Sequence, residues 1–251
     1  MKFFDVIVIG SGPSGIFSSL ELAEKGYKVL ILEKGKELEK RKCPALEKQI
    51  PCVKCGECSI TSGFGGAGAF SDGKVTLSTE VGGNLKDFVS EGELTNLFAF
   101  VEGRLKAAGA PDRVFGTNVE KIEKIAYEAQ KFGLNLIRSR VLHMGTDKGY
   151  EVLMNLREEL NRKGVEIRSS EPALDLIIED GAVKGVVTPK DSYYSRFVIM
   201  APGRSGAEWA FKMCQKYGIE TETNPVDIGV RLEVPAEILK HLTDILYEPK
   251  I

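Results

Sequence analysis

The chain has 251 residues, of which 43% are hydrophobic and 28% charged, and 34 basic against 36 acidic side chains give a formal net charge of −2. This composition is typical of a soluble globular protein with one large domain or one and a half, and the balanced charge excludes a polybasic footprint for nucleic acid. No apolar run approaches the roughly 18 residues of a membrane helix, so we expect a cytoplasmic protein without a membrane or nucleic-acid partner.

A strand followed by a glycine-rich turn opens the chain. Residues 6–9 read Val-Ile-Val-Ile, which favours a buried parallel strand. Three glycines follow in G-x-G-x-x-G spacing: Gly10, Gly12 and Gly15. The first permits a tight turn, the second lets the backbone approach a pyrophosphate, and the third lets a helix pack close to the strand. Pro13 suits the first turn of that helix, whose free N–H groups, with that of Ser14 among them, point at the phosphates.

A second strand, Lys28 to Leu32, follows the helix that Gly26 ends. It delivers Glu33, a carboxylate placed to bond a ribose hydroxyl, with Lys34 beside it. Strand, glycines, helix, strand and acid within about thirty residues predict a dinucleotide site. NAD and FAD both present an adenosine diphosphate to such a unit, so the fingerprint alone leaves the two open.

Four of the five cysteines stand close together in the sequence. They are Cys43, Cys52, Cys55 and Cys58. In a cytosolic protein such a cluster favours metal or redox chemistry over structural disulfides. A Cys-x2-Cys-x2-Cys run with a separate Cys-Pro is similar to the ligand set of an iron–sulfur cluster; zinc, redox-active thiols and cysteines without a ligand stay open. Neighbouring basic residues, Arg41 among them, either favour an anionic cluster or form a solvated basic surface.

Two helices are predicted between Glu91 and Phe132. Apolar residues recur at helical spacing in both, and Gly109-Ala-Pro111 separates them. We interpret residues 91–133 as a helical insertion that forms part of a cap over the cofactor.

His143 precedes a further predicted helix. Thr146 or Asp147 would cap this helix, and Gly164 would end it. The histidine could act as a general acid or base, or it could be a structural residue bonded to backbone. The residues alone leave both interpretations open.

Strand patterns return after this helix. Residues 164–188 read as a strand and then a hairpin that turns at Asp180-Gly181. A later strand ends in Val198–Gly203.

The last segment carries helix and strand signals. Ser205-x-x-Glu208 predicts the capping box of a helix. Alternating apolar residues predict a strand over Val226–Val234, and Pro235 opens a final helix.

This order of elements resembles the glutathione-reductase-type FAD superfamily. There, a β-meander is followed by a returning strand that ends in Ala/Thr-x-Gly beside the cofactor, and Ala201-Pro-Gly203 is similar. More narrowly, the cysteine run, the stretch Gly63–Lys74 and His143-Met-Gly-Thr-Asp147 resemble a group of prokaryotic FAD-dependent dehydrogenases. The resemblance spans essentially the whole chain. It implies FAD and an oxidoreductase reaction, but it does not indicate the substrate.

The resemblance also implies where the cofactor lies. The isoalloxazine or pyrophosphate would meet the glycine-rich stretch, and the adenine would lie near the strand around Ala173. The implied cofactor contacts are Gly65, Gly66, Gly68, Ser71, Ala173, Ala201, Gly203 and Arg204. Lys74 and His143 are the expected catalytic residues, which would tune charge near the ring. The alternative for the glycine-rich stretch is an ordinary flexible loop.

We therefore expect an α/β fold in three parts. These are a Rossmann-like FAD-binding domain with a β-meander (residues 1–90 and 134–224), a helical insertion (91–133) and the beginning of a second, substrate domain (225–251). The superfamily returns late to the flavin with a Gly-Asp or Gly-Glu segment, which residues 204–251 do not resemble. We thus expect the N-terminal portion of a longer protein, which associates with itself or with a complementary C-terminal polypeptide.

The expected function is that of a FAD-dependent oxidoreductase with a small-molecule substrate and NAD(P)H as a candidate electron donor. Two alternatives stay open. One is a non-catalytic nucleotide-binding half that needs a complementary chain, and the other is an NAD-binding protein whose cysteines hold structural zinc.

Overall fold

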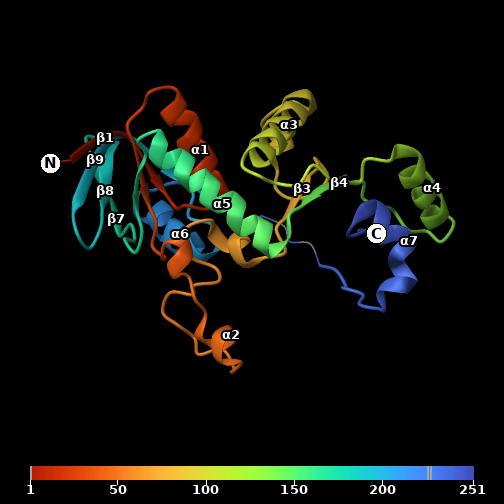
Figure 1. The fold of residues 1–251 in the computed structure, drawn as a ribbon. Coiled ribbons are helices and arrows are strands. Elements are labelled where there is room, and N and C mark those ends of the chain that lie inside the picture. Colours follow the sequence, from red (N-terminus) through yellow and green to blue (C-terminus); the bar gives the residue numbers. More distant parts are fainter. Residues whose placement is uncertain (1, 225, 227) are drawn as a thin grey trace. The chain divides into compact units, whose positions relative to one another are not determined.

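The computed structural model describes residues 2–224, 226 and 228–251. They fall into two compact units, traced from the N-terminus to the C-terminus in Figure 1. Unit 1 comprises Met1–Ser71 and Leu153–Asn224, and unit 2 comprises Asp72–Val152 and Pro225–Ile251. The domain ranges expected from the sequence stay a prediction.

Unit 1 is built on a six-stranded sheet with the strand order β6-β2-β1-β9-β8-β7. Its strands are β1 Lys2–Ile9, β2 Val29–Leu32, β6 Glu166–Arg168, β7 Asp175–Glu179, β8 Ala182–Val187 and β9 Ser192–Met200. Four of them, β6, β2, β1 and β9, run parallel, whereas β8 pairs antiparallel with both β9 and β7. The aliphatic strand β2 is buried throughout, as expected where both faces of a parallel sheet are covered. The predicted α/β, Rossmann-like class is confirmed.

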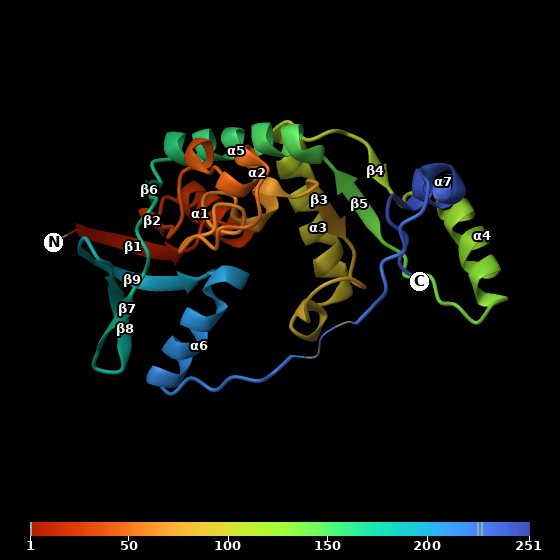
Figure 2. The same ribbon diagram turned by 90° about the horizontal axis from the view of Figure 1, so that it is seen from below.

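Helices cover both faces of this sheet. A Cβ at Gly15 of α1 would lie 3.4 Å from Val8, whereas Trp209 of α6 packs with the cluster of Ile7 and Ile9, which point to the other face. Figure 2 shows α1 and α6 on opposite sides of the sheet. The helices and 3-10 turns of unit 1 are α1 Pro13–Glu24, η1 Leu38–Lys40, α2 Pro44–Lys48, η2 Gly66–Phe70, η4 Arg204–Gly206 and α6 Ala207–Lys216.

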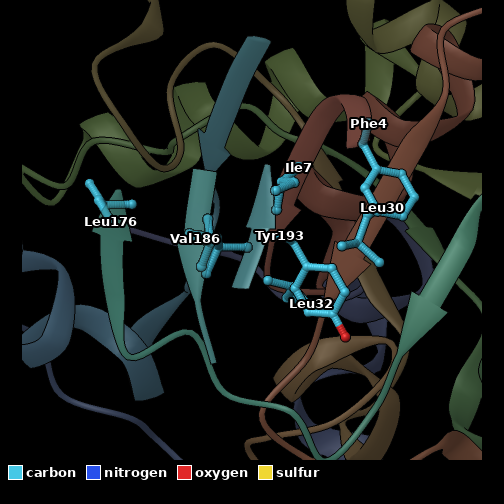
Figure 3. Packing of buried hydrophobic residues seen from close by; sticks show 8 residues of the cluster. Phe4, Ile7, Leu30, Leu32, Leu176, Val186 and Tyr193 are labelled. Atoms are coloured by element: carbon cyan, nitrogen blue, oxygen red, sulfur yellow. The ribbon is translucent and has the colours of Figure 1, made fainter. Parts of the chain in front are cut away.

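The core of unit 1 lies on this sheet. Its buried side chains, shown in Figure 3, come from β1, β2, β7, β8 and β9: Phe4, Ile7, Ile9, Leu30, Leu32, Leu176, Val186 and Tyr193. Burying one such apolar side chain stabilises a fold by about 1.5–3 kcal/mol. The core therefore holds the ends of β1, β2 and β9 in place, and the loops of the candidate site start from these strand ends.

The predicted hairpin is confirmed. β7 and β8 pair around Asp180 and Gly181, which have φ angles of 51° and 73°. Two successive residues with left-handed φ angles make a turn whose twist matches that of the two strands it joins.

Unit 2 contains a three-stranded antiparallel sheet with the order β3-β5-β4. Its elements are β3 Lys74–Leu77, η3 Leu85–Asp87, α3 Glu91–Ala107, β4 Val114–Phe115, α4 Val119–Gln130, β5 Arg140–His143 and α7 Ala236–Leu246. Both helices predicted between residues 91 and 132 form, and α4 and α7 share a small core around Ile122 and Leu246. The helix α5, Gly145–Arg162, begins among residues of unit 2 and ends among those of unit 1. In the described part of the chain, no helix is long and apolar enough to cross a membrane.

The strand predicted over Val226–Val234 is wrong for the described part of that range, residues 226 and 228–234, which are irregular; residues 225 and 227 lie outside the described residues. Ile228 and Val230 are 95% and 97% exposed. Alternation alone does not make a strand, because the backbone also needs a partner to complete its hydrogen bonds. The described residues offer it no such partner.

Two predicted helix caps are also wrong. The helix α5 begins at Gly145, ahead of Thr146 and Asp147. The cap of α6 is Gly206, without a side-chain hydrogen bond, so the Ser205/Glu208 box does not form.

Candidate functional site

Two glycines of the fingerprint are required by the fold itself. Gly10 has a φ of 104°, and a Cβ there would lie 2.2 Å from the carbonyl oxygen of Ala201. A Cβ at Gly15 would lie 1.9 Å from the carbonyl oxygen of Gly10. Both distances are far below any real contact, so the turn and the packing of α1 on the sheet explain these residues.

Gly12 is different, because its surroundings are open. A Cβ there would meet only the Cα of Gly66, at 3.9 Å. The helix α1 starts immediately afterwards with Pro13, and within the described chain it has no side-chain cap and no acidic residue in its first turn. Free N–H groups at a helix N-terminus, beside open space, suit a phosphate. This cradle therefore fits the pyrophosphate of a dinucleotide.

Glu33 binds three loops together at this place. Oε2 accepts hydrogen bonds from the backbone N–H and the hydroxyl of Ser11, at 2.9 and 2.7 Å. Oε1 accepts from the backbone N–H groups of Gly35 and Gly63, at 2.8 and 3.0 Å. The side chain is buried, and each carboxylate oxygen already has two donors, which fills its usual capacity. The ribose contact predicted for Glu33 stays untested, and it would require one of these bonds to open.

Arg41 supports the glycine-rich stretch through hydrogen bonds to backbone carbonyls. The residue is buried, and its guanidinium donates to five backbone carbonyls, those of Ser59, Ile60, Gly63, Phe64 and Gly66. It also lies 4.8 Å from the ring centroid of Phe70. Burial lowers the pKa of Arg41 to about 10, so it remains a cation at neutral pH. The expectation of a solvated basic surface is wrong at this position, because the loop's carbonyls need these donors.

The loop after β9 ends at the same edge of the sheet. The backbone N–H of Ala201 donates to the carbonyl of Ile9 at 2.9 Å, and Lys34 Nζ donates to the carbonyl of Ser205 at 2.9 Å. Gly203 has a left-handed φ of 61° and precedes Arg204. The loops after β1 and β2 thus meet the glycine-rich stretch, and the loop after β9 meets those two loops. All of them lie at the carboxyl ends of parallel strands, where ligands bind in open α/β sheets.

The structure therefore gathers most of the predicted cofactor residues in one region of unit 1. They are Gly10, Gly12, Pro13, Ser14, Gly15, Glu33, Lys34, Gly65, Gly66, Gly68, Ser71, Ala201, Gly203 and Arg204. The backbone N–H of Gly65 donates to the carbonyl of Ser11 at 2.9 Å, which joins the glycine-rich stretch to the fingerprint. The hydroxyl of Ser71 donates to the carbonyl of Gly68. Ala173 is partly buried against the core of the sheet.

The four clustered cysteines do not converge. Cys52, Cys55 and Cys58 are exposed, Cys43 is half-buried, and all are free thiols. In the described ranges no three His, Cys, Asp or Glu side chains are placed to hold a metal ion. Hydrogen bonds from the backbone N–H groups of Thr61 and Ile60 lower the pKa of Cys58. The residues do not fit an iron–sulfur or zinc centre in this arrangement, and the metal site stays a prediction without support.

The predicted catalytic residues lie together in unit 2. Lys74 and His143 are paired across β3 and β5. His143 Nε2 lies 2.8 Å from Asp72 Oδ1, the hydroxyl of Tyr247 donates to Asp72 Oδ2 at 2.6 Å, and Lys74 forms an ion pair with Glu248. His143 is thus bonded to a carboxylate side chain. Its catalytic role stays a prediction.

The sequence does not predict the roles of several residues in these networks. Ser11 occupies a variable position of the fingerprint, and Arg41 lies in a basic run. Tyr247 lies far along the chain from its partner Asp72. Only Arg41 could have been predicted. A glycine-rich loop whose backbone carbonyls are buried needs hydrogen-bond donors, and an arginine side chain offers five.

The sequence matches the model of a known protein family. The model described as FAD binding domain matches residues 5–41 and 76–228, which is more than half of the chain. The match includes the fingerprint and the strands that form the site.

Individual relatives are longer than this chain. An uncharacterized protein of Clostridium beijerinckii is 30% identical over 93% of this chain and 37% of that protein. One component of the fumarate reductase (CoM/CoB) of Methanothermobacter marburgensis is 24% identical over 73% of this chain and 30% of that protein. The chain thus spans about a third of the length of these curated relatives.

Among solved structures, the fold is similar to that of 3-ketosteroid-delta4-(5alpha)-dehydrogenase from Rhodococcus jostii RHA1. The TM-score is 0.50 at 19% identity, over 79% of this chain and 45% of that chain. At this identity, the likeness concerns the fold alone.

Proposed function

The chain belongs to the FAD binding domain family, and on that premise we propose that it works as a FAD-dependent oxidoreductase on a small-molecule substrate. The observation that carries the proposal is the open cradle at Gly12, where the loops after three parallel strands and the glycine-rich stretch meet. Bound FAD would supply the redox chemistry, which is the transfer of an electron pair or hydride. The protein would supply position and electrostatics.

Each part of the cradle has a distinct role in this proposal. The N–H groups at the start of α1 and the backbone of Gly12 would hold the pyrophosphate. Gly65, Gly66 and Gly68 would lie against the cofactor with their backbone. Glu33 and Arg41 would act on the cofactor indirectly, because they hold the loops in place through nine hydrogen bonds to other groups of the protein.

Finer parts of the proposal have their own support. We propose the glutathione-reductase-type branch of FAD proteins, because the β-meander leads into a strand that ends in Ala201-Pro-Gly203. Pairing with a second copy or a further polypeptide is supported by the exposed apolar residues Ile228, Val230 and Leu232. A cytoplasmic location is supported by free cysteines. NAD(P)H is the donor to test first, since it reduces many flavins.

The experiment is a spectrum followed by a reduction. The purified chain is mixed with FAD, freed of excess cofactor, and reduced without oxygen by NADH, NADPH or, as a positive control, dithionite. We expect a protein-bound flavin spectrum that a biological donor bleaches. Bound FAD that only dithionite reduces would favour the non-catalytic nucleotide-binding half, and a chain that retains no FAD would contradict the proposal.

A further inference from the structure

A carboxylate, an imidazole and a phenol form a closed cluster in unit 2. Asp72 stands just before β3, His143 ends β5, and Tyr247 directly follows α7. One carboxylate oxygen of Asp72 lies 2.8 Å from His143 Nε2, and the other accepts the hydroxyl of Tyr247 at 2.6 Å. The two rings stack with their centroids 4.2 Å apart and their planes at 27°. Each member therefore touches the other two.

Further contacts fix the cluster. The ring of Phe115 lies 5.1 Å from that of Tyr247 and has the guanidinium of Arg113 over it. Lys74 opposes His143 across the sheet and pairs with Glu248, the residue after Tyr247. Tyr247 has a φ of 62°, which a tyrosine rarely adopts. A residue held in such a conformation indicates that the surrounding contacts determine its place.

The charges of the cluster determine which nitrogen of the imidazole carries its proton. Burial raises the pKa of Asp72, but the hydrogen bonds from Tyr247 and His143 outweigh it and hold that pKa below its usual value. Burial and the bond to Asp72 raise the pKa of Tyr247 to about 12. At neutral pH, Asp72 is therefore an anion and Tyr247 a donor. An anion beside Nε2 requires a proton on that nitrogen, so neutral His143 has its lone pair on Nδ1.

We propose that Asp72 and Tyr247 are positioning residues that hold His143 as a proton acceptor, which takes a proton from a substrate O–H or N–H group through Nδ1. In this step the O–H or N–H bond breaks and leaves its electron pair on the substrate, and a bond from Nδ1 to hydrogen forms. The resulting imidazolium still donates from Nε2 to Asp72, whose charge balances it. The reverse transfer restores the starting state. The side chain of His143 is 27% exposed, so part of the imidazole faces solvent.

The inference goes beyond the proposed function and does not depend on FAD, because every group in it belongs to unit 2. It also differs from a structural role for His143. A structural histidine requires only that a hydrogen bond exists, whereas a proton acceptor requires one defined tautomer with a reachable lone pair. Those two properties can be measured directly.

Long-range proton–nitrogen spectra of the labelled full chain report the tautomer. The chain has two histidines, and exposed His241 serves as an internal reference. His143→Gln assigns the signals. We expect neutral His143 to be a single tautomer protonated at Nε2, and neutral His241 to show the mixture of a free imidazole. Asp72→Ala should shift the His143 signals to those of His241, and the milder Tyr247→Phe should shift them part of the way.

Glu123→Gln is the matched control, because it removes an exposed carboxylate of unit 2 that pairs with Arg138 and lies outside the cluster, and it should leave the signals in place. Carbethoxylation by diethyl pyrocarbonate, mapped by mass spectrometry, tests whether Nδ1 is reachable, since the reagent consumes the lone pair of a neutral nitrogen. We expect His143 to react with the reagent, as exposed His241 does.

Two results would overturn the inference. One is a tautomer of His143 that is protonated at Nδ1 or unchanged in both Asp72→Ala and Tyr247→Phe. The other is a His143 that resists the reagent while His241 reacts. Failure to bind FAD would refute the proposed function and leave these measurements unaffected, so the two failures are distinguishable.

Discussion

Each unit contains a carboxylate at the centre of a network, and the two networks differ in kind. Glu33 in unit 1 is 5% exposed and accepts four hydrogen bonds, three of them from backbone N–H groups. The side chain of Asp72 in unit 2 is 55% exposed and bonds two side chains that can each gain or lose a proton. The first network fixes the backbone, and the second orients chemical groups.

This difference indicates what each network can do. A saturated, buried carboxylate holds loops in one arrangement but has no free lone pair for a reaction. A half-exposed carboxylate contributes little to stability, since water screens it, but it can set the tautomer of a histidine. We therefore expect substitutions in the Glu33 network to change stability and FAD binding, and substitutions in the Asp72 network to change proton chemistry.

The largest expected effect is that of Glu33→Gln. The amide keeps the shape of the side chain but turns one acceptor into a donor, which would face the N–H groups of Ser11, Gly35 or Gly63. Hydrogen bonds to buried charged groups contribute about 1.5–3 kcal/mol each, so we expect the free energy of unfolding to fall by about 2–4 kcal/mol. Denaturant unfolding measures it.

Asp72→Asn is the matched control for this change. It makes the same acid-to-amide replacement at a half-exposed site, and we expect it to lower the free energy of unfolding by no more than about 1 kcal/mol. Equal losses in the two variants would refute the distinction between the networks.

The next effect is that of Arg41→Lys. Lysine keeps the positive charge, but its three donors cannot serve five carbonyls. We expect a loss of about 1–3 kcal/mol of stability and weaker FAD binding, because the glycine-rich stretch loses its support. Arg138→Lys, at an exposed pair with Glu123, should change neither property. An Arg41→Lys protein with unaltered FAD affinity would show that the guanidinium does not shape the site.

A smaller difference in stability is expected between variants of two tyrosine–carboxylate pairs. Tyr193 donates to buried Glu171 at 2.8 Å in unit 1, and Tyr247 donates to Asp72 in unit 2. We expect Tyr193→Phe to cost about 1–2 kcal/mol at neutral pH, because Glu171 loses a donor, and Tyr247→Phe to cost less. Unfolding of both variants at pH 7 checks the order, and the reverse order would contradict it.

The pH dependence of the Tyr193 effect has a defined sign. Burial and the bond to Glu171 raise the pKa of Tyr193 to about 12 from an ordinary value of 10.0. A group whose pKa is raised on folding stabilises the fold fully below its unfolded value and loses this contribution as the pH rises through the folded value. The difference between wild type and Tyr193→Phe should therefore shrink between about pH 10 and pH 12. A difference that grows there would mean that the phenol does not donate to Glu171.

The sequence predicted unit 1 better than unit 2 for physical reasons. The fingerprint, the hairpin at Asp180 and the returning strand are local patterns, and their side chains need only neighbours along the chain or the sheet. The Asp72–Tyr247 pair joins residues that no local pattern relates. The strand predicted over residues 226–234 failed because alternation indicates which face is apolar, but only a partner completes a strand.

Helix caps also show that a local sequence pattern does not by itself determine the structure. Ser205 and Glu208 have the spacing of a capping box, as do Ser90 and Glu93, and only the second pair forms one. The helix α6 starts instead after Gly206, directly behind the 3-10 turn that follows β9. The position of that strand end, rather than the pattern, determines where the helix can begin.

A titration of FAD tests most directly whether unit 1 holds FAD at Gly12. Gly12→Val is suited to this test because a Cβ at Gly12 meets no protein atom closer than 3.9 Å, so the fold should survive while the phosphates lose their place. Gly56→Val, at another open glycine of unit 1, controls for the added side chain. We predict that Gly12→Val weakens FAD binding by about 10- to 100-fold or more, as the loss of one or two charged hydrogen bonds implies, and that Gly56→Val leaves it unchanged. A folded Gly12→Val protein that binds FAD as tightly as the wild type would contradict the account.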